Sequence, residues 1–273
     1  MIVFLLLLAA LLLAIGLIYT NREVLLRFGR WALNRRYAVT LSGTDCLNPA
    51  DVYLVIPNHP AIVDPLIVVG ELHRFCLDVR PLVDESFFSN GFVRHILVMF
   101  RAVRVPDFRH VNFRPILKSR PTRVDSVRRA QALGTTVLST LTNGGNVLVY
   151  PSGHITPDGS ESLDNRQLAF NIISKLPEKV RVLGVRTRGL YGSMWSRVNG
   201  APAPPFTRTL IKSFLMWTVT FFRSKRPVHL HVEDLTARCR AWVQGGKQEF
   251  NHCLEAWYDA DLKLSGKDHE EAT

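Results

Sequence analysis

The chain has 273 residues, and its formal net charge at pH 7 is +11. A positive charge of this size favours acidic partners, of which an anionic membrane surface is the simplest and nucleic acid the next. The sequence has no motif that reads nucleic acid, and its aromatic residues lie among aliphatic ones as core residues do, so we expect no nucleic-acid partner. It also has no linker and no internal repeat, which predicts one domain with a sizeable core.

An apolar segment opens the chain. Ile2 to Tyr19 is a run of 18 residues without a charged side chain. At about 1.5 Å per residue, such a helix spans most of a hydrocarbon core about 30 Å thick. We therefore expect residues 1–20 to be a transmembrane anchor. A cleaved signal peptide is the alternative, but the basic start, shorter apolar core and cleavage site of such signals are not visible.

A basic segment, residues 21–36, follows the apolar run, and we expect it to form a juxtamembrane helix. Against the single Glu23, it carries the arginines Arg22, Arg27, Arg30, Arg35 and Arg36. Positive residues accumulate on the cytoplasmic side of membrane segments. This bias predicts a single-pass membrane protein whose remaining chain lies in the cytoplasm.

The segment from Asn58 to Pro65 follows a short apolar run, Val52 to Ile56, which predicts a buried strand. His59 then lies at the carboxyl end of that strand. Asp64 precedes a proline, which favours a helix that begins at the proline with Asp64 as its N-cap. A loop that curls back between strand and helix would bring the Asp64 carboxylate onto one imidazole nitrogen and leave the other free to take a proton.

Two interpretations of His59 and Asp64 are open at this point. A carboxylate before a helix is often no more than a cap, and a histidine and an aspartate at this spacing also arise by chance. The other interpretation is a general base with the carboxylate that orients it, because loop residues at strand ends often carry function. The second reading needs support from elsewhere in the chain.

A second segment has a similar organisation. Residues 122–142 predict a helix, which ends before the pair Gly144-Gly145, where a left-handed conformation is needed. Asn146 to Tyr150 then predicts a strand, and the tight turn Pro151 to Gly153 follows at its carboxyl end. Ligands of open α/β sheets bind outside the carboxyl ends of the strands, and backbone N–H groups in such a turn can hold an anion.

Further apolar runs alternate with helical stretches and predict an α/β fold, in which a single domain at residues 37–264 has a mixed β-sheet flanked by helices. These further strands are Cys76 to Pro81, Ala102 to Val105, Val180 to Val185 and Val228 to Val232. Residues 265–273 are a polar tail. Leu210 to Phe222 is apolar and, at 13 residues, too short to cross a membrane. Both an in-plane interfacial helix and a buried core helix fit it.

The two segments, in this order, resemble the glycerolipid acyltransferase family of lysophospholipid and 1-acylglycerol-3-phosphate acyltransferases. The first motif of that family, Asn-His-x-x-x-x-Asp, is matched in full by Asn58, His59 and Asp64. The third, Phe-Pro-Glu-Gly-Thr-Arg or a close variant, is matched by Tyr150, Pro151 and Gly153. The resemblance covers roughly residues 37–261 and favours the catalytic interpretation of the first motif.

The third motif also departs from the family. Ser152 stands where the family has glutamate, and the arginine position holds Ile155 or, in a variant spacing, His154. Because the glutamate and the arginine of the third motif are both missing, we expect an acceptor larger or less charged than lysophosphatidic acid. The second motif of the family usually supplies an arginine for the acceptor phosphate, and a surface ion pair is the alternative role for each candidate. These candidates are Arg101, Arg104 and Arg109.

The resemblance implies transfer of a fatty acyl group from a coenzyme A or acyl-carrier-protein thioester to a hydroxyl of a lysophospholipid or related membrane glycerolipid. His59 would take the proton of the acceptor hydroxyl, and Asp64 would orient the imidazole and stabilise the imidazolium. Besides the arginines, the residues expected to contact substrate are Asn58, Ser152, Gly153 and His154. We expect no cofactor, because the acyl carrier is a co-substrate, and no metal, because the cysteines and histidines lack metal-ligand spacing.

Two other classes of protein stay open. A membrane-anchored lipid- or acyl-carrier-binding protein without activity would account for the missing glutamate at Ser152, and a hydrolase would pass the acyl group to water. The complete first motif, with His59 and Asp64, favours the transferase, because a binding fold has no need of that pair. The acceptor head group, the acyl chain, the donor carrier and the oligomeric state are not determined by any sequence pattern.

Overall fold

The computed structural model describes residues 16, 20–106, 111–114, 117–119, 123–157, 159–164, 166–197, 208–209, 211–212 and 224–270. Within these ranges, no helix has the length and apolar character needed to cross a membrane. The expected anchor, residues 1–20, lies outside them apart from residues 16 and 20. Most of the apolar segment Leu210 to Phe222 also lies outside the described residues.

A mixed seven-stranded sheet forms the centre of the domain, in the order β1-β9-β8-β2-β7-β3-β4. Its strands are β1 (Tyr37–Ser42), β2 (Val52–Pro57), β3 (Val79–Asp84), β4 (Val103–Val105), β7 (Asn146–Leu148), β8 (Val180–Arg188) and β9 (Arg226–Asp234). The five strands from β8 to β4 are mutually parallel, whereas β9 runs antiparallel to β8 and β1 runs parallel to β9. A separate antiparallel pair comprises β5 (Val111–Arg114) and β6 (Leu117–Ser119).

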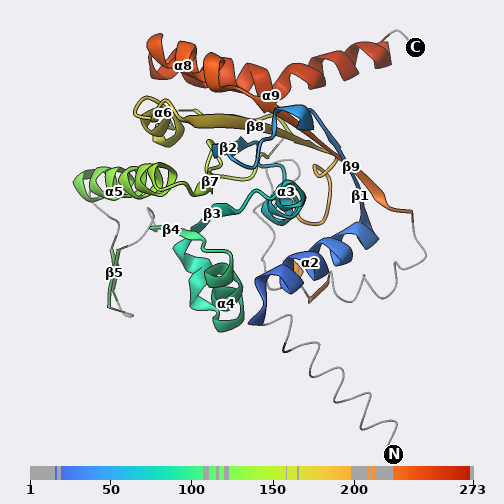
Figure 1. Ribbon diagram of the computed structural model, residues 1–273, viewed down its shortest axis with the longest axis horizontal. Helices are drawn as coiled ribbons and strands as arrows, with labels where there is room; N and C mark the ends of the chain where they lie inside the picture. Colours follow the sequence, from blue (N-terminus) through green and yellow to red (C-terminus); the bar gives the residue numbers. More distant parts are fainter. Residues whose placement is uncertain are drawn as a thin grey trace, which may run out of the picture.

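Helices cover both faces of the sheet (Figure 1). One side carries α2 (Arg22–Arg36), α3 (Asp64–Leu72) and α4 (Gly91–Met99), and the other carries α5 (Arg123–Thr142), α6 (Leu168–Ile173), α8 (Thr236–Gln244) and α9 (Lys247–Glu270). Short 3-10 helices η1 (Thr44–Cys46), η2 (His73–Phe75) and η3 (Glu85–Ser89) complete the described elements. The α/β class and the mixed sheet flanked by helices, both predicted from sequence, are confirmed.

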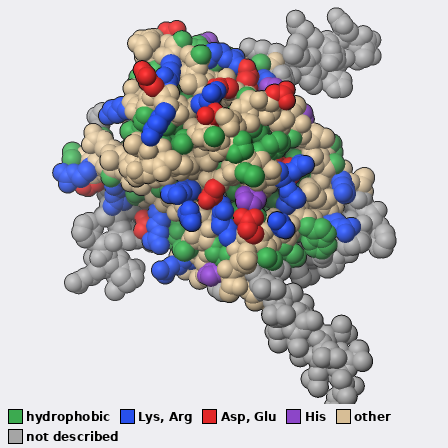
Figure 2. Space-filling view, in the orientation of Figure 1, with side chains coloured by type: hydrophobic (Ala, Val, Ile, Leu, Met, Phe, Trp, Pro, Cys, Tyr) green, Lys and Arg blue, Asp and Glu red, His purple; other side chains and the backbone are tan. Residues whose placement is uncertain are grey.

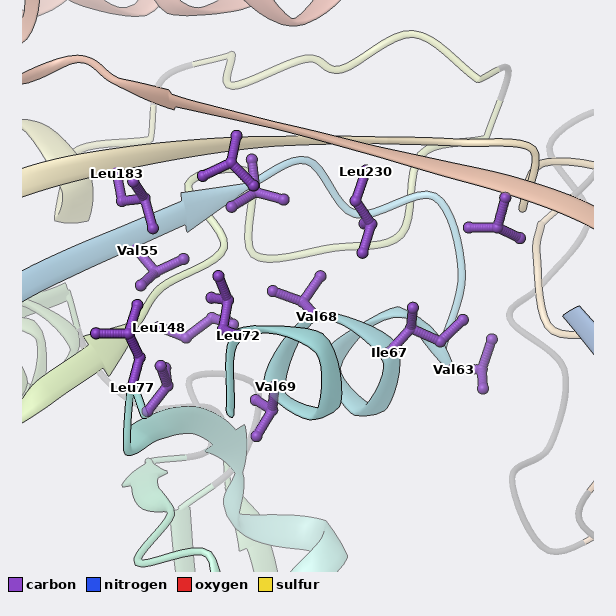
Figure 3. Packing of buried hydrophobic residues seen from close by; sticks show 14 of the residues in the cluster. Val55, Val63, Ile67, Val68, Val69, Leu72, Leu77, Leu148, Leu183 and Leu230 are labelled. Carbon is purple, nitrogen blue, oxygen red and sulfur yellow. The ribbon is translucent and has the colours of Figure 1, made fainter. Parts of the chain in front are cut away.

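Each face of the sheet has its own hydrophobic core. Alternate residues of β2 point to opposite faces, so Val55 packs in the cluster with α3 and Leu54 in the cluster with α5, α6 and α9. Figure 3 shows Val68 and Leu72 on the side of α3 that faces the sheet, with Leu72 next to Val55. A strand covered on both faces has to be apolar throughout, which explains the uninterrupted run that identified β2 in the sequence.

Several element boundaries differ from the sequence-based expectation. Strand β3 begins at Val79, not at Cys76, because Cys76 takes a left-handed conformation (φ 58°) where η2 ends. Strand β1 was not anticipated, and it pairs with β9, which lies near the other end of the chain. Helix α9 continues to Glu270, into the stretch expected to be a polar tail.

Candidate active site

The two motif segments meet at one edge of the sheet. Since β2, β7 and β8 are adjacent and parallel, the loop after β2 and the turn after β7 leave the sheet side by side. The N–H of Thr156 donates to the carbonyl oxygen of His59 at 3.0 Å, which joins the two segments directly. The site is therefore built where open α/β sheets bind ligands.

Asn58 fixes the start of the first loop. Its side chain is buried, with its oxygen accepting from the N–H of Thr187 at 2.7 Å and its nitrogen donating to the Thr187 carbonyl at 3.2 Å. Its own N–H donates to the carbonyl of Val185 at 3.2 Å. These bonds extend the pairing of β2 with β8 by one residue. Asn58, predicted to contact substrate, thus uses its amide to hold the loop that carries His59.

The His59 ring stacks on the Tyr150 ring, with centroids 4.0 Å apart and planes 25° from parallel. Its Nδ1 atom is buried and has no hydrogen-bond partner. Burial, together with the nearby His154, lowers the pKa of His59 to about 3. The imidazole is consequently neutral at physiological pH, which is the state that a general base requires.

Asp64 is fully buried and does not cap α3, because the helix shows no side-chain cap and the N-cap position falls at Val63. The carboxylate instead accepts from the Tyr150 hydroxyl at 2.8 Å. Burial raises the pKa of Asp64 to about 7, against the opposing effects of Thr187 and Tyr150. Because the Asp64 carboxyl group is buried and does not cap the helix, the functional interpretation of Asp64 is favoured over its interpretation as a helix cap.

The hydrogen bond expected between His59 and Asp64 is absent from the structure. One Asp64 oxygen, Oδ1, is buried without a partner, as is His59 Nδ1. Tyr150 connects the two residues, since its ring stacks on His59 and its hydroxyl donates to Asp64. A movement that brought the two unpartnered atoms together would satisfy two buried polar groups at once.

The turn after β7 is closed by its own hydrogen bonds. Ser152 is fully buried, and its hydroxyl donates to the carbonyl of His154 at 3.0 Å. The half-buried His154 places its Nδ1 at 2.9 Å from the Ser152 carbonyl. Gly153 is exposed, adopts a left-handed conformation (φ 64°) and donates its N–H to the Tyr150 carbonyl at 3.1 Å. The Ser152 hydroxyl and the Gly153 N–H, both expected to hold substrate, are therefore engaged within the turn.

The structure separates the described candidate arginines from His59. Arg101 forms an ion pair with Asp78 at 3.6 Å; Asp78 precedes β3, so the pair lies at the amino edge of the parallel strands, opposite the site. Arg104 lies on β4, which is three strands away from β2 in the sheet, a separation of roughly 14 Å between the two strands. Its guanidinium stacks on the Phe88 ring. Arg109 lies outside the described residues.

Three residues of the site had no role in the sequence-based prediction. Tyr150 was recognised only as a motif match, although its position next to Pro151 was a usable signal. Thr187 lies beside Asp64 from β8, and Glu161 accepts from the N–H of His59 at 3.1 Å. No pattern in the sequence singles out either of them, because both reach the site through the tertiary fold.

Metal ligands do not gather in the part of the chain that the structure describes, where no group of three or more His, Cys, Asp and Glu side chains could hold an ion. All four cysteines are free. His229 and His231 alternate along β9 and so share one of its faces, and a ring nitrogen of each lies 3.0 Å from the Ser42 hydroxyl on β1. They contribute to strand pairing at the sheet edge.

Comparisons with known proteins agree with this geometry. Residues 38–186 match the family model described as Acyltransferase. Among solved structures, the 1-acyl-sn-glycerophosphate (LPA) acyltransferase PlsC from Thermotoga maritima has a similar fold, with a TM-score of 0.54 and 16% sequence identity over 90% of this chain and 81% of that one. Curated protein sequences gave no significant match. The family model covers both motif segments, and the structural likeness extends the shared fold to most of the chain.

Proposed function

Because the chain belongs to the acyltransferase family, we propose that it moves a fatty acyl group from a coenzyme A or acyl-carrier-protein thioester to a hydroxyl of a lysophospholipid or related membrane glycerolipid. The observation that carries this proposal is the connection of His59 to Asp64 through Tyr150 at the carboxyl edge of the sheet. A buried neutral imidazole next to a buried carboxyl group is suited to general-base chemistry.

The reaction requires one proton to be moved twice. His59 takes the proton of the acceptor hydroxyl while its oxygen forms a bond to the thioester carbonyl carbon. The tetrahedral intermediate then breaks its C–S bond, and the departing sulfur receives the proton from the imidazolium. No covalent acyl-enzyme is needed, because the motif contains no serine or cysteine nucleophile beside the histidine.

Asp64 stabilises the imidazolium that forms in this sequence. Its pKa of about 7 leaves a substantial ionised fraction at neutral pH. In the resting site, the Tyr150 hydroxyl donates to one carboxylate oxygen of Asp64. The other oxygen, Oδ1, has no hydrogen-bond partner, and neither has Nδ1 of His59. We propose that these two atoms form a hydrogen bond when substrate occupies the site, because both are buried without a partner in the resting site.

The proposed acceptor is larger or less charged than lysophosphatidic acid. Ser152 is buried where the resembled motif has an acid, and Arg101 is paired with Asp78 away from the site. The turn from Ser152 to His154, which has no arginine, then suits a head group that does not present a bare phosphate dianion. Because the N–H groups of Gly153 and Thr156 already donate to Tyr150 and His59, the proposed contacts to the head group are the other backbone N–H groups of this turn and Arg109.

We further propose that the protein is held in the membrane by residues 1–20, with the domain in the cytoplasm where the thioester donors occur. Helix α2 supports this placement, because Phe28 and Trp31 are 44% and 43% exposed and Arg35 lies over the Trp31 ring at 5.3 Å. Exposed aromatic rings among arginines are typical of surfaces in contact with lipid head groups. Figure 2 shows Lys and Arg side chains spread over the drawn face of the domain.

The test compares the full-length wild-type protein with His59→Ala in detergent or vesicles, supplied with acyl-CoA and a panel of lysophospholipids. We expect His59→Ala to reduce product formation by about 10²- to 10⁴-fold with an unchanged amount of folded protein. His229→Ala is the matched control, because His229 is exposed on β9 and should not affect turnover.

The outcomes separate the three classes of protein. Wild-type turnover by His59→Ala would reject the general base. Release of free fatty acid at the same rate with and without acceptor would identify a hydrolase. A wild-type protein that binds acyl-CoA or lysophospholipid but forms no product with any donor and acceptor would favour the non-catalytic binding protein.

A further inference from the structure

Glu161 is a buried acid that the proposed reaction does not yet use. It is 4% exposed and lies in the loop after the Pro151–Thr156 turn. Helix α9 holds this loop, since Glu161 donates its N–H to Asp259 at 3.4 Å and Leu163 donates its N–H to Glu255 at 2.5 Å. The Glu161 side chain is therefore presented to the site by a loop that is tied to a long helix.

The carboxyl group of Glu161 contacts the main chain of the proposed base. Its Oε2 accepts from the N–H of His59 at 3.1 Å, while the carbonyl of His59 accepts from the N–H of Thr156 at 3.0 Å. The peptide groups on both sides of the His59 side chain are thus held by Thr156 and Glu161, which lie five residues apart in the chain. With the ring stacked on Tyr150, these contacts determine where the imidazole lies.

Glu161 also lies against Ser152. Burial raises the pKa of Glu161 to about 8, and the Ser152 hydroxyl and the His59 N–H oppose this effect. Ser152 and Glu161 are both buried, and Glu161 lies nine residues further along the chain. An acid is therefore present in this part of the site even though position 152 has none.

We propose that Glu161 is a positioning residue for acyl transfer, which fixes His59 by accepting its backbone N–H. The hydrogen bond, not a negative charge, carries this role, because at neutral pH the carboxyl group is largely protonated and its carbonyl oxygen still accepts. The inference rests on the proposed function of His59.

The experiment uses three variants of the full-length protein. Glu161→Ala removes the acceptor and should lower kcat roughly 10- to 100-fold, because a small displacement of a catalytic group is enough for such a loss. KM for both substrates should stay within about two-fold, since no substrate contact is removed. Glu161→Gln keeps a neutral carbonyl acceptor of the same length and should restore kcat to near the wild-type value.

Glu255→Ala is the matched control. It removes a carboxylate from the N–H of Leu163 in the same loop without contacting His59, so it should affect stability more than kcat. Thermal unfolding of all variants separates loss of folded protein from loss of turnover.

Three results would overturn the inference: wild-type kcat in Glu161→Ala, equal losses in Glu161→Ala and Glu255→Ala, or a Glu161→Gln variant as slow as Glu161→Ala. If His59→Ala is itself fully active, the proposed function fails. If His59→Ala is inactive while Glu161→Ala is fully active, only the positioning role is rejected.

Discussion

Replacing Asp64 by asparagine should make the protein more stable at alkaline pH and much less active. Asparagine has the shape of aspartate without its charge. Its oxygen can accept from the Tyr150 hydroxyl, and its amide can donate to the oxygen of the neighbouring Thr187 hydroxyl. The substitution therefore removes a buried charge while keeping the hydrogen bond that connects Asp64 to the ring stacked on His59.

The size of the effect follows from the pKa of Asp64, which burial raises from 3.8 to about 7. Because the folded state binds the proton more tightly, the carboxyl group contributes its full stability below pH 3.8 and loses it as the pH rises through 7. Each pKa unit corresponds to about 1.4 kcal/mol, so the upper limit is about 4 kcal/mol. Asp64→Asn never ionises, and its advantage over the wild type should grow from near zero at pH 4 towards this limit at pH 8.

Activity should change in the opposite direction. Without a carboxylate, the imidazolium formed on His59 loses the group that stabilises it, and we expect turnover to fall by about 10²- to 10⁴-fold. The assay pairs denaturant unfolding in detergent at pH 4, 6 and 8 with product formation from acyl-CoA and a lysophospholipid. A charge that lowers stability but raises the rate is typical of an active site.

Asp234→Asn is the control of opposite sign. Burial acts to raise the pKa of Asp234, but hydrogen bonds from Thr236 and Arg181 outweigh it, and the pKa is lowered. The stability that Asp234 contributes is therefore present at neutral pH and lost as the pH falls through its folded pKa, so Asp234→Asn should be the less stable protein at pH 8. The reasoning is refuted if Asp64→Asn shows no gain in stability from pH 4 to pH 8, or if it keeps wild-type turnover.

Three further predictions concern the site and the membrane. Tyr150→Phe keeps the ring stacked on His59 but removes the O–H that donates to Asp64, so the pKa of Asp64 should rise further, activity at neutral pH should fall and the acidic limb of the pH–rate profile should move to higher pH; an unchanged pH–rate profile would contradict this role. Ser152→Glu buries a second carboxyl group beside Glu161 and should lower both turnover and stability. If the wild type is inert towards every acceptor and Ser152→Glu gains turnover on lysophosphatidic acid, the wild type is instead a decayed enzyme. A reporter fused after Thr273 should be active only in the cytoplasm, and activity only on the far side of the membrane would reject the orientation and the cytoplasmic donors with it.

The sequence by itself determined the parts of the protein that depend on local patterns. The apolar run of β2 and the proline after Asp64 placed a strand, a loop and a helix in order, and the structure has them in that order. The helix over residues 122–142, the glycines after it and the strand at Asn146 are also local signals. Strands covered on both faces are apolar throughout, so their sequence identifies them without knowledge of their neighbours.

Only the tertiary structure decided how the site is connected. Tyr150 and Asp64 are 86 residues apart in the chain, and Glu161 and His59 are 102 apart, yet each pair shares a hydrogen bond. Arg101 looked like a ligand for the acceptor phosphate until the fold paired it with Asp78 at the opposite edge of the sheet. The physical reason is that strand order, which adjacent residues do not encode, determines which loops meet and which carboxyl groups are buried, and burial in turn sets the pKa values on which the chemistry depends.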